Sequence, residues 1–174
     1  YSSDSQLLLS LKEYVENPAK YYGFEIHIGG VVDTVVVSTK TCSIARNFYP
    51  DLKKVFNQLH QFIQEKNLSI THFPIAFINR NRNDSIEIAV AIPVNRISGT
   101  QVGIFFQTMP RGRMLIGKYE GPYKNIGNLY AVLRHYLSDY SLTPVALPYE
   151  KYLNNKLPES DNALINAEVY FPIY

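Results

Sequence analysis

Apolar residues follow two rhythms along this chain, one typical of helices and the other of strands. Within residues 52–63, and again within residues 126–137, they are spaced by three and four positions. Such spacing collects apolar side chains on one face of a helix, so two amphipathic helices are predicted. The segments that flank each helix are rich in Val, Ile, Thr, Tyr and Phe and alternate in polarity, which predicts strands.

The pattern of residues 41–80 recurs in residues 115–154 at a constant offset of 74, without a gap. Tyr49 aligns with Tyr123, and the apolar positions coincide almost throughout. Two copies are too few for a solenoid, so the repeat indicates a duplicated supersecondary unit. Each copy reads as two strands, one helix and two further strands.

The first two strands of each copy are expected to pair with each other. Gly29 and Gly30 favour a turn between the members of the first pair. The expected pairs are residues 24–28 with residues 33–43, and residues 102–109 with residues 112–121.

Because each helix has a single apolar stripe, both helices are expected on one face of a mainly antiparallel sheet. The predicted class is therefore α+β: a duplicated β(β)αββ unit with a ligand groove between the copies. The first copy is assigned to residues 22–97 and the second to residues 98–174. Residues 1–21 are interpreted as an N-terminal connector, in which Leu7 and Leu11 fit a helical stripe.

Composition and charge narrow the classes of function. A net charge of +2 over 174 residues is too small a basic excess to indicate nucleic-acid binding. No apolar stretch approaches the ~20 residues of a membrane span. The single cysteine, Cys42, excludes a disulfide framework and a cysteine-rich zinc site, and it is interpreted as a buried strand residue.

The chain begins with Tyr rather than Met, which indicates a fragment or a processed product. An upstream domain or a membrane anchor is therefore left open, and so is the choice between a cytoplasmic and a membrane-anchored location. The four histidines lie far apart without the spacing of metal ligands, and the chain has no Gly-rich phosphate loop and no G-x-S-x-G motif. We therefore expect no cofactor and no metal.

The stretch LPYEKYLNN, residues 147–155, contains the strongest candidate for chemistry. On a strand, Glu150 and Tyr152 share one face, whereas Tyr149 and Lys151 share the other. A carboxylate among apolar strand residues is costly unless it is paired or useful. Beside tyrosines it suits a lipophilic cation, through charge and through cation–π contact. The alternative is a partly exposed glutamate paired with Lys151 or with Lys118.

A second carboxylate, Glu168, has Tyr170 on its own face of the last strand. Two carboxylates in one groove could divide acid and base roles between them; the alternative is a solvated glutamate near a strand end. Tyr123 aligns with Tyr49 and could instead be a structural residue at the start of a helix. The expected aromatic walls of the groove are Tyr119, Tyr123 and Tyr152.

Three features of the second copy are together similar to the GyrI-like effector-binding domain family. They are Gly121-Pro122-Tyr123 before the helix, Glu-x-Tyr-Leu-Asn at 150–154, and Glu-x-x-x-Pro at 168–172. The resemblance covers about residues 22–174 and is looser in the first copy. That family includes the bacterial gyrase-inhibitory protein and the drug-sensing domains of multidrug-responsive transcription regulators.

The resemblance implies a duplicated βαββ fold with an aromatic pocket between the copies and a buried glutamate in it. The pocket would take a bulky hydrophobic molecule that is often cationic, so the first hypothesis is a domain that senses or sequesters such a ligand. A second is a hydrolase of cyclopropane-bearing electrophilic toxins, in which Glu150 or Glu168 orients water. A third is a protein-binding module like the gyrase inhibitor. The chain contains no helix-turn-helix, so we expect no direct contact with nucleic acid from it.

Overall fold

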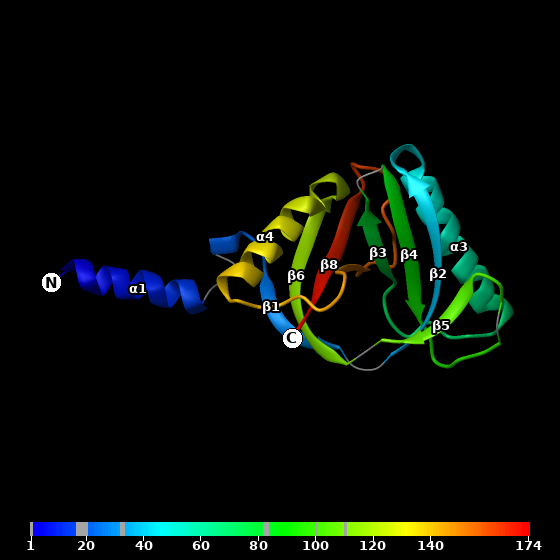
Figure 1. Ribbon diagram of the computed structural model, residues 1–174, viewed down its shortest axis with the longest axis horizontal. Coiled ribbons are helices and arrows are strands. Elements are labelled where there is room, and N and C mark those ends of the chain that lie inside the picture. Colours follow the sequence, from blue (N-terminus) through cyan, green and yellow to red (C-terminus); the bar gives the residue numbers. More distant parts are fainter. Residues whose placement is uncertain (1, 17–20, 32–33, 82–83, 100, 110) are drawn as a thin grey trace.

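The computed structural model describes residues 2–16, 21–31, 34–81, 84–99, 101–109 and 111–174 (Figure 1). The helices are α1 (Ser2–Glu16), α3 (Phe48–Glu65) and α4 (Ile126–Asp139), and the short 3-10 turns Ala45–Asn47 and Tyr123–Asn125 lead into the last two. The strands are β1 (Ile26–Val31), β2 (Val35–Ile44), β3 (Ile75–Arg80), β4 (Ser85–Pro93), β5 (Ile104–Thr108), β6 (Gly112–Pro122), β7 (Tyr149–Tyr152) and β8 (Leu164–Ile173).

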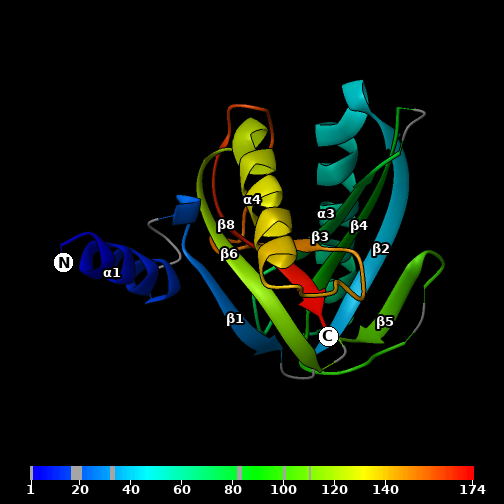
Figure 2. The ribbon, with the colours of Figure 1, turned by 60° about the vertical axis from the view of Figure 1, so that its left-hand side comes forward.

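Within the described residues, the strands form one antiparallel sheet in the order β1-β6-β8-β7-β3-β4-β2-β5. The two halves of the chain meet at its centre, where β3 pairs with β7 through Ile75–Lys151 and Ala76–Glu150. Figure 2 shows the halves splayed apart, with α4 on one and α3 on the other. The predicted α+β class is confirmed.

The helices α3 and α4 pack on the same face of the sheet, and each buries the apolar stripe that its residue spacing predicts. Along α3 the buried stripe contains Leu52, Leu59 and Phe62, and along α4 it contains Leu129 and Leu133. These side chains form one continuous core with inward-facing residues of β2, β3, β4, β6 and β8. Burial of apolar surface, at roughly 25 cal/mol per Å², is the main force that holds the helices on the sheet.

Residues that are 74 positions apart have the same structural role in the two halves. Asn67 ends α3 and Ser141 ends α4, each with a positive φ, of 50° and 51°. In both places the next residue turns back onto its helix: the amide of Leu68 donates to Ile63 and that of Leu142 to Leu137. This is the left-handed closure with which many helices end.

The pairing predicted for the first strands of each half is wrong. β1 pairs with β6 along its whole length, and β5 pairs with β2, so each edge strand lies on the other half. Gly29 and Gly30 lie within β1 rather than in a turn, and a Cβ at Gly29 would come within 2.8 Å of Ile116. Either partner would satisfy the backbone hydrogen bonds equally well, so alternation alone cannot select one.

A second, smaller core lies on the sheet face that carries no helix. It contains Val36, Ile75, Met114, Tyr149 and Tyr170. Val31, at the end of β1, and Met109, just after β5, pack against it. Because this cluster contains residues from both halves, it holds the two halves together on the helix-free face of the sheet.

The sequence also makes predictions for the N-terminal segment and for Cys42, and the structure places both at the periphery of the fold. The helix α1 lies within the predicted N-terminal connector and extends away from the sheet, with Leu7 and Leu11 exposed (Figure 1); residues 1 and 17–20 of that connector lie outside the described residues. The expectation that Cys42 is buried is wrong, because its side chain is exposed on β2. Among the described helices, none has the length and hydropathy needed to cross a bilayer.

Candidate functional site

The centre of the sheet places a carboxylate where the two halves meet. Glu150 on β7 lies between Ala76 of β3 and Val169 of β8, both of which are fully buried. Its own side chain is only 2% exposed and points to the helix side of the sheet. The small Ala76, which is the residue 74 positions earlier, leaves room beside the carboxyl group.

Tyrosine hydroxyls satisfy this buried carboxylate. Tyr130 of α4 donates to Glu150 Oε1 at 3.0 Å, and Tyr152 of β7 donates to Oε2. Tyr123, in the 3-10 turn that leads into α4, also lowers the pKa of this carboxyl group. The alternative that Glu150 pairs with Lys151 or Lys118 is wrong, because a carboxylate ringed by phenols on the helix side is out of reach of both lysines.

The carboxylate forms the floor of a cavity of about 580 Å³ between the helices, which we call the central cavity. Its walls come from the end of β3, the first residues of α3, one face of α4, residues 147–150 and the loop between β7 and β8. Tyr49 and Tyr123 lie at the helix starts, 6.1 Å apart by ring centroids. The volume is in the range of about 300–1,000 Å³ that is usual for small-molecule sites.

Burial controls the protonation of Glu150 at the floor of the cavity. Loss of water raises the pKa of Glu150 above its ordinary value, and the hydrogen bonds from Tyr152, Tyr130 and Tyr123, together with the positive charge of Arg80, oppose that rise. Burial and the charge of Glu150 in turn raise the pKa of Tyr130 and of Tyr152, so these phenols remain donors at neutral pH.

The stability of the protein should therefore depend on pH through Glu150. Because its folded pKa is raised above the ordinary 4.5, the folded state holds this proton more tightly than the unfolded state. The free energy of unfolding of the wild type, relative to Glu150→Gln, should fall as pH rises from 4.5 through the raised pKa and then level off. Denaturant unfolding of both proteins from about pH 4 to about pH 8 measures this difference.

Glu168→Gln is the control variant, because it removes a glutamate from the opposite face of the sheet. Its free energy of unfolding is measured over the same pH range. If the wild type instead gained stability over Glu150→Gln with rising pH, the tyrosine hydrogen bonds would outweigh burial and the assigned direction would be wrong.

The structure brings only some of the predicted site residues together. Tyr123 lines the central cavity beside Glu150. Tyr152 is fully buried behind the carboxylate, which it supports without lining the cavity. Tyr119 packs within the core against Phe24 and donates its hydroxyl to the carbonyl of Pro122 at 2.6 Å, so it supports the strand end rather than the pocket.

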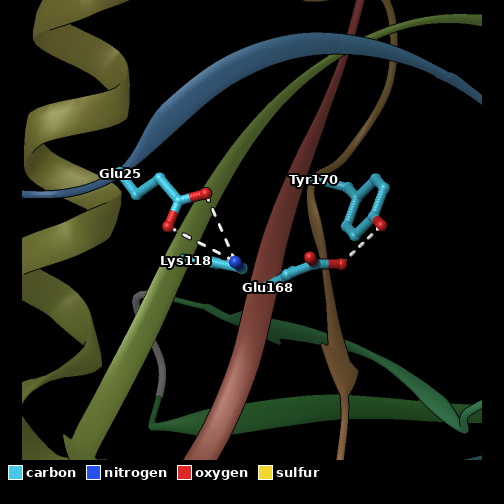
Figure 3. Close-up of polar contacts among 4 residues, drawn as sticks. All are labelled: Glu25, Lys118, Glu168 and Tyr170. Atoms are coloured by element: carbon cyan, nitrogen blue, oxygen red, sulfur yellow. Dashed lines mark hydrogen bonds and ion pairs between the residues drawn. The ribbon is translucent and has the colours of Figure 1, made fainter. Parts of the chain in front are cut away.

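The expectation that Glu168 and Tyr170 share the groove with Glu150 is wrong. Cross-strand register places Glu168 opposite Lys151, on the face that carries no helix. There Tyr170 donates to Glu168 at 2.7 Å, and the Lys151 ammonium lies 3.8 Å from the same carboxylate. Figure 3 shows the Glu168–Tyr170 pair beside Lys118, whose ammonium donates to Glu25 at 3.2 Å. The two carboxylates therefore cannot divide acid and base roles at one centre.

Other residues of the central cavity were not singled out from the sequence, although a signal for them exists. Gly127, Tyr130 and Arg134 are spaced by three and four, which places them on a second face of α4 beside the apolar stripe. Tyr130 was assigned to the stripe but is only half-buried, because it lies at the edge of the stripe that faces the cavity. Asp161 lies in a polar loop and had no such signal.

Asp161 helps to close one end of the cavity. Its carboxylate accepts a hydrogen bond from the Tyr49 hydroxyl, and its carbonyl accepts the backbone amide of Lys124 at 2.9 Å. The described residues contain no group of three or more His, Cys, Asp or Glu side chains arranged to hold a metal ion. The chemistry of the cavity is thus that of one carboxylate, several phenols and basic side chains.

Comparison with known proteins identifies the class to which this fold and cavity belong. The family model described as the GyrI-like small molecule binding domain matches residues 34–174, so the chain belongs to the GyrI-like family. No protein of curated function is significantly similar in sequence.

Three solved structures illustrate the shared fold. The chain is similar to EcmrR in its complex with DNA (TM-score 0.74, 18% identity), covering 98% of this chain and 66% of that one. It is also similar to the EcmrR C-terminal domain (TM-score 0.71, 19% identity, 87% and 98% covered). A third is SAV2435 bound to tetraphenylphosphonium (TM-score 0.54, 13% identity, 86% and 94% covered). This chain therefore spans less than two thirds of the EcmrR chain in the DNA complex.

Proposed function

We propose that this domain binds one bulky aromatic molecule in the central cavity and holds a donor or cationic group of that molecule on Glu150. The observation that carries the proposal is the buried carboxylate at the floor of a cavity of about 580 Å³, fixed by tyrosine hydroxyls. A carboxylate has about four acceptor positions, so the tyrosines leave capacity for a further donor. Aromatic walls add cation–π attraction for a delocalised positive charge.

Two relatives support this class of ligand and its use. SAV2435 was solved with tetraphenylphosphonium, which is a lipophilic cation. EcmrR was solved on DNA, as a longer chain in which the shared fold is one part. A role for this domain in sensing or sequestering a bulky hydrophobic molecule with a cationic group is consistent with both relatives.

Filling the cavity should abolish binding without harm to the fold. Gly127 lines the central cavity on α4, and a Cβ there would meet nothing within 4 Å. Gly127→Phe should therefore fold, since phenylalanine is also a better helix residue than glycine. We expect it to raise the Kd for rhodamine 123, a planar cationic dye, by at least about tenfold. Fluorescence anisotropy titration measures this Kd.

Asn128→Phe adds the same ring one position along α4, where the side chain is exposed and outside the cavity lining. It should bind the dye like the wild type. Equal affinity of all three proteins would place the dye elsewhere and contradict the proposed site, and hydrolysis of the dye during the titration would favour an enzyme.

A further inference from the structure

Basic side chains surround the entrance of the central cavity. Arg80 from the end of β3, and Lys124 and Arg134 from the α4 segment, line it and are all exposed, whereas Glu150 lies buried at the floor. We call these three residues the cationic rim. No carboxylate among the described residues forms an ion pair with any of them.

Aromatic rings hold two of the rim residues in place. The Arg80 guanidinium lies over Phe48 at 4.9 Å from the ring centroid, and that of Arg134 lies over Tyr130 at 5.7 Å. A guanidinium that stacks on a ring keeps its N–H donors at the edge of its plane. Both side chains are thus positioned to donate toward an occupant of the cavity.

Within the described residues, the acidic groups of the cavity form no ion pair with the rim, although the positive charge of Arg80 lowers the pKa of Glu150. Glu150 accepts from Tyr130 and Tyr152, and Asp161 accepts from Tyr49. Both carboxylates therefore have phenol donors in direct contact, whereas no carboxylate among the described residues forms an ion pair with the three basic side chains. Like charges that line one concave site reinforce each other and raise the local concentration of opposite charge.

We propose that the ligand of the central cavity is amphoteric: it carries an acidic group, such as a carboxylate or sulfonate, that binds Arg80 and Arg134, and a donor or cationic group that binds Glu150. This inference rests on the proposed function and specifies the chemistry of its ligand. A purely cationic molecule would satisfy the floor and meet repulsion at the rim. A molecule with both groups satisfies both ends of the cavity at once.

Two dyes that differ at one group test this inference. Rhodamine 110 has a free carboxylate, and rhodamine 123 is its methyl ester; both share the same cationic, amino-substituted ring system. The wild type should bind the acid about fivefold more tightly than the ester at low ionic strength, since charge-assisted bonds at exposed groups are screened by water. Salt should reduce the preference.

Variants identify the groups responsible. In Arg80→Gln/Arg134→Gln most of the preference should be lost, and in Lys124→Gln a smaller part of it. Lys54→Gln, which removes an exposed lysine of α3 outside the cavity lining, should leave it unchanged. The rim residues are exposed, so these variants should fold.

The outcomes separate this inference from the proposed function. If both dyes bind and the ester binds as tightly as the acid, or if the double variant keeps the preference, the inference is overturned while the proposed function stands. If neither dye binds, both are overturned. Tighter binding of the acid that is lost only in the rim variants supports both.

Discussion

Glu150→Gln is expected to weaken binding of rhodamine 123 and rhodamine 110 by about 10- to 100-fold. A hydrogen bond to a charged group contributes about 1.5–3 kcal/mol, and 1.4 kcal/mol corresponds to a tenfold change in Kd. Glutamine keeps the volume of the side chain between Ala76 and Val169. Its oxygen can still accept from one tyrosine, and its amide can donate to the other hydroxyl, so the fold should persist.

Glu168→Gln is the matched control for this measurement. It makes the same chemical change on the neighbouring strand β8, on the face without helices, and should leave both Kd values within about twofold of the wild type. Isothermal titration calorimetry gives the affinities, and thermal unfolding without dye shows whether each variant is folded. Equal losses in the two variants would mean that general electrostatics, rather than contact with Glu150, determines affinity.

Gly117→Val is expected to lower the free energy of unfolding by about 2–3 kcal/mol, which is the usual cost of forcing extra atoms into a packed core. Gly117 lies on β6 where α4 crosses it. A Cβ there would come within 2.7 Å of Leu129 and within 3.0 Å of Leu133, both fully buried. The helix would have to lift from the sheet, and α4 carries Tyr130 and Arg134 at its cavity face. Denaturant unfolding measures the loss.

Gly112→Val places the same side chain at the start of the same strand, where a Cβ would meet nothing within 4 Å. Its free energy of unfolding should stay within about 0.5 kcal/mol of the wild type. If Gly112→Val were as destabilising as Gly117→Val, the close approach of α4 to Gly117 would not be the cause of the loss, since valine itself favours a strand.

Much of the fold follows from local patterns. The helix stripes around Leu59 and Leu133 and the alternation of the strands are properties of short segments, and the structure buries the side chains that these patterns select. The same holds for Glu150 and Tyr152: they are two residues apart on a strand, so they necessarily share a face, and the apolar neighbours already made the carboxylate unusual.

The positions that the sequence did not predict depend on contacts between distant segments. Glu168 alternates correctly within β8, but its face relative to Glu150 depends on the register of β8 against β7, and a slip of one residue would reverse it. The sequence did not distinguish Tyr119 from Tyr123 as a wall of the groove. In the structure Tyr119, on β6, packs in the core and donates its hydroxyl to the carbonyl of Pro122.

By itself, the sequence determined the class of fold, the two helix faces and the one strand face on which a carboxylate is buried, because each depends on residues a few positions apart. Only the tertiary structure decided that β1 and β5 exchange partners, that Glu168 lies on the far face, and that Arg80 and Arg134 meet around one cavity. Those outcomes depend on which of several equivalent backbone pairings buries more apolar surface, and that quantity exists only once the whole chain is packed.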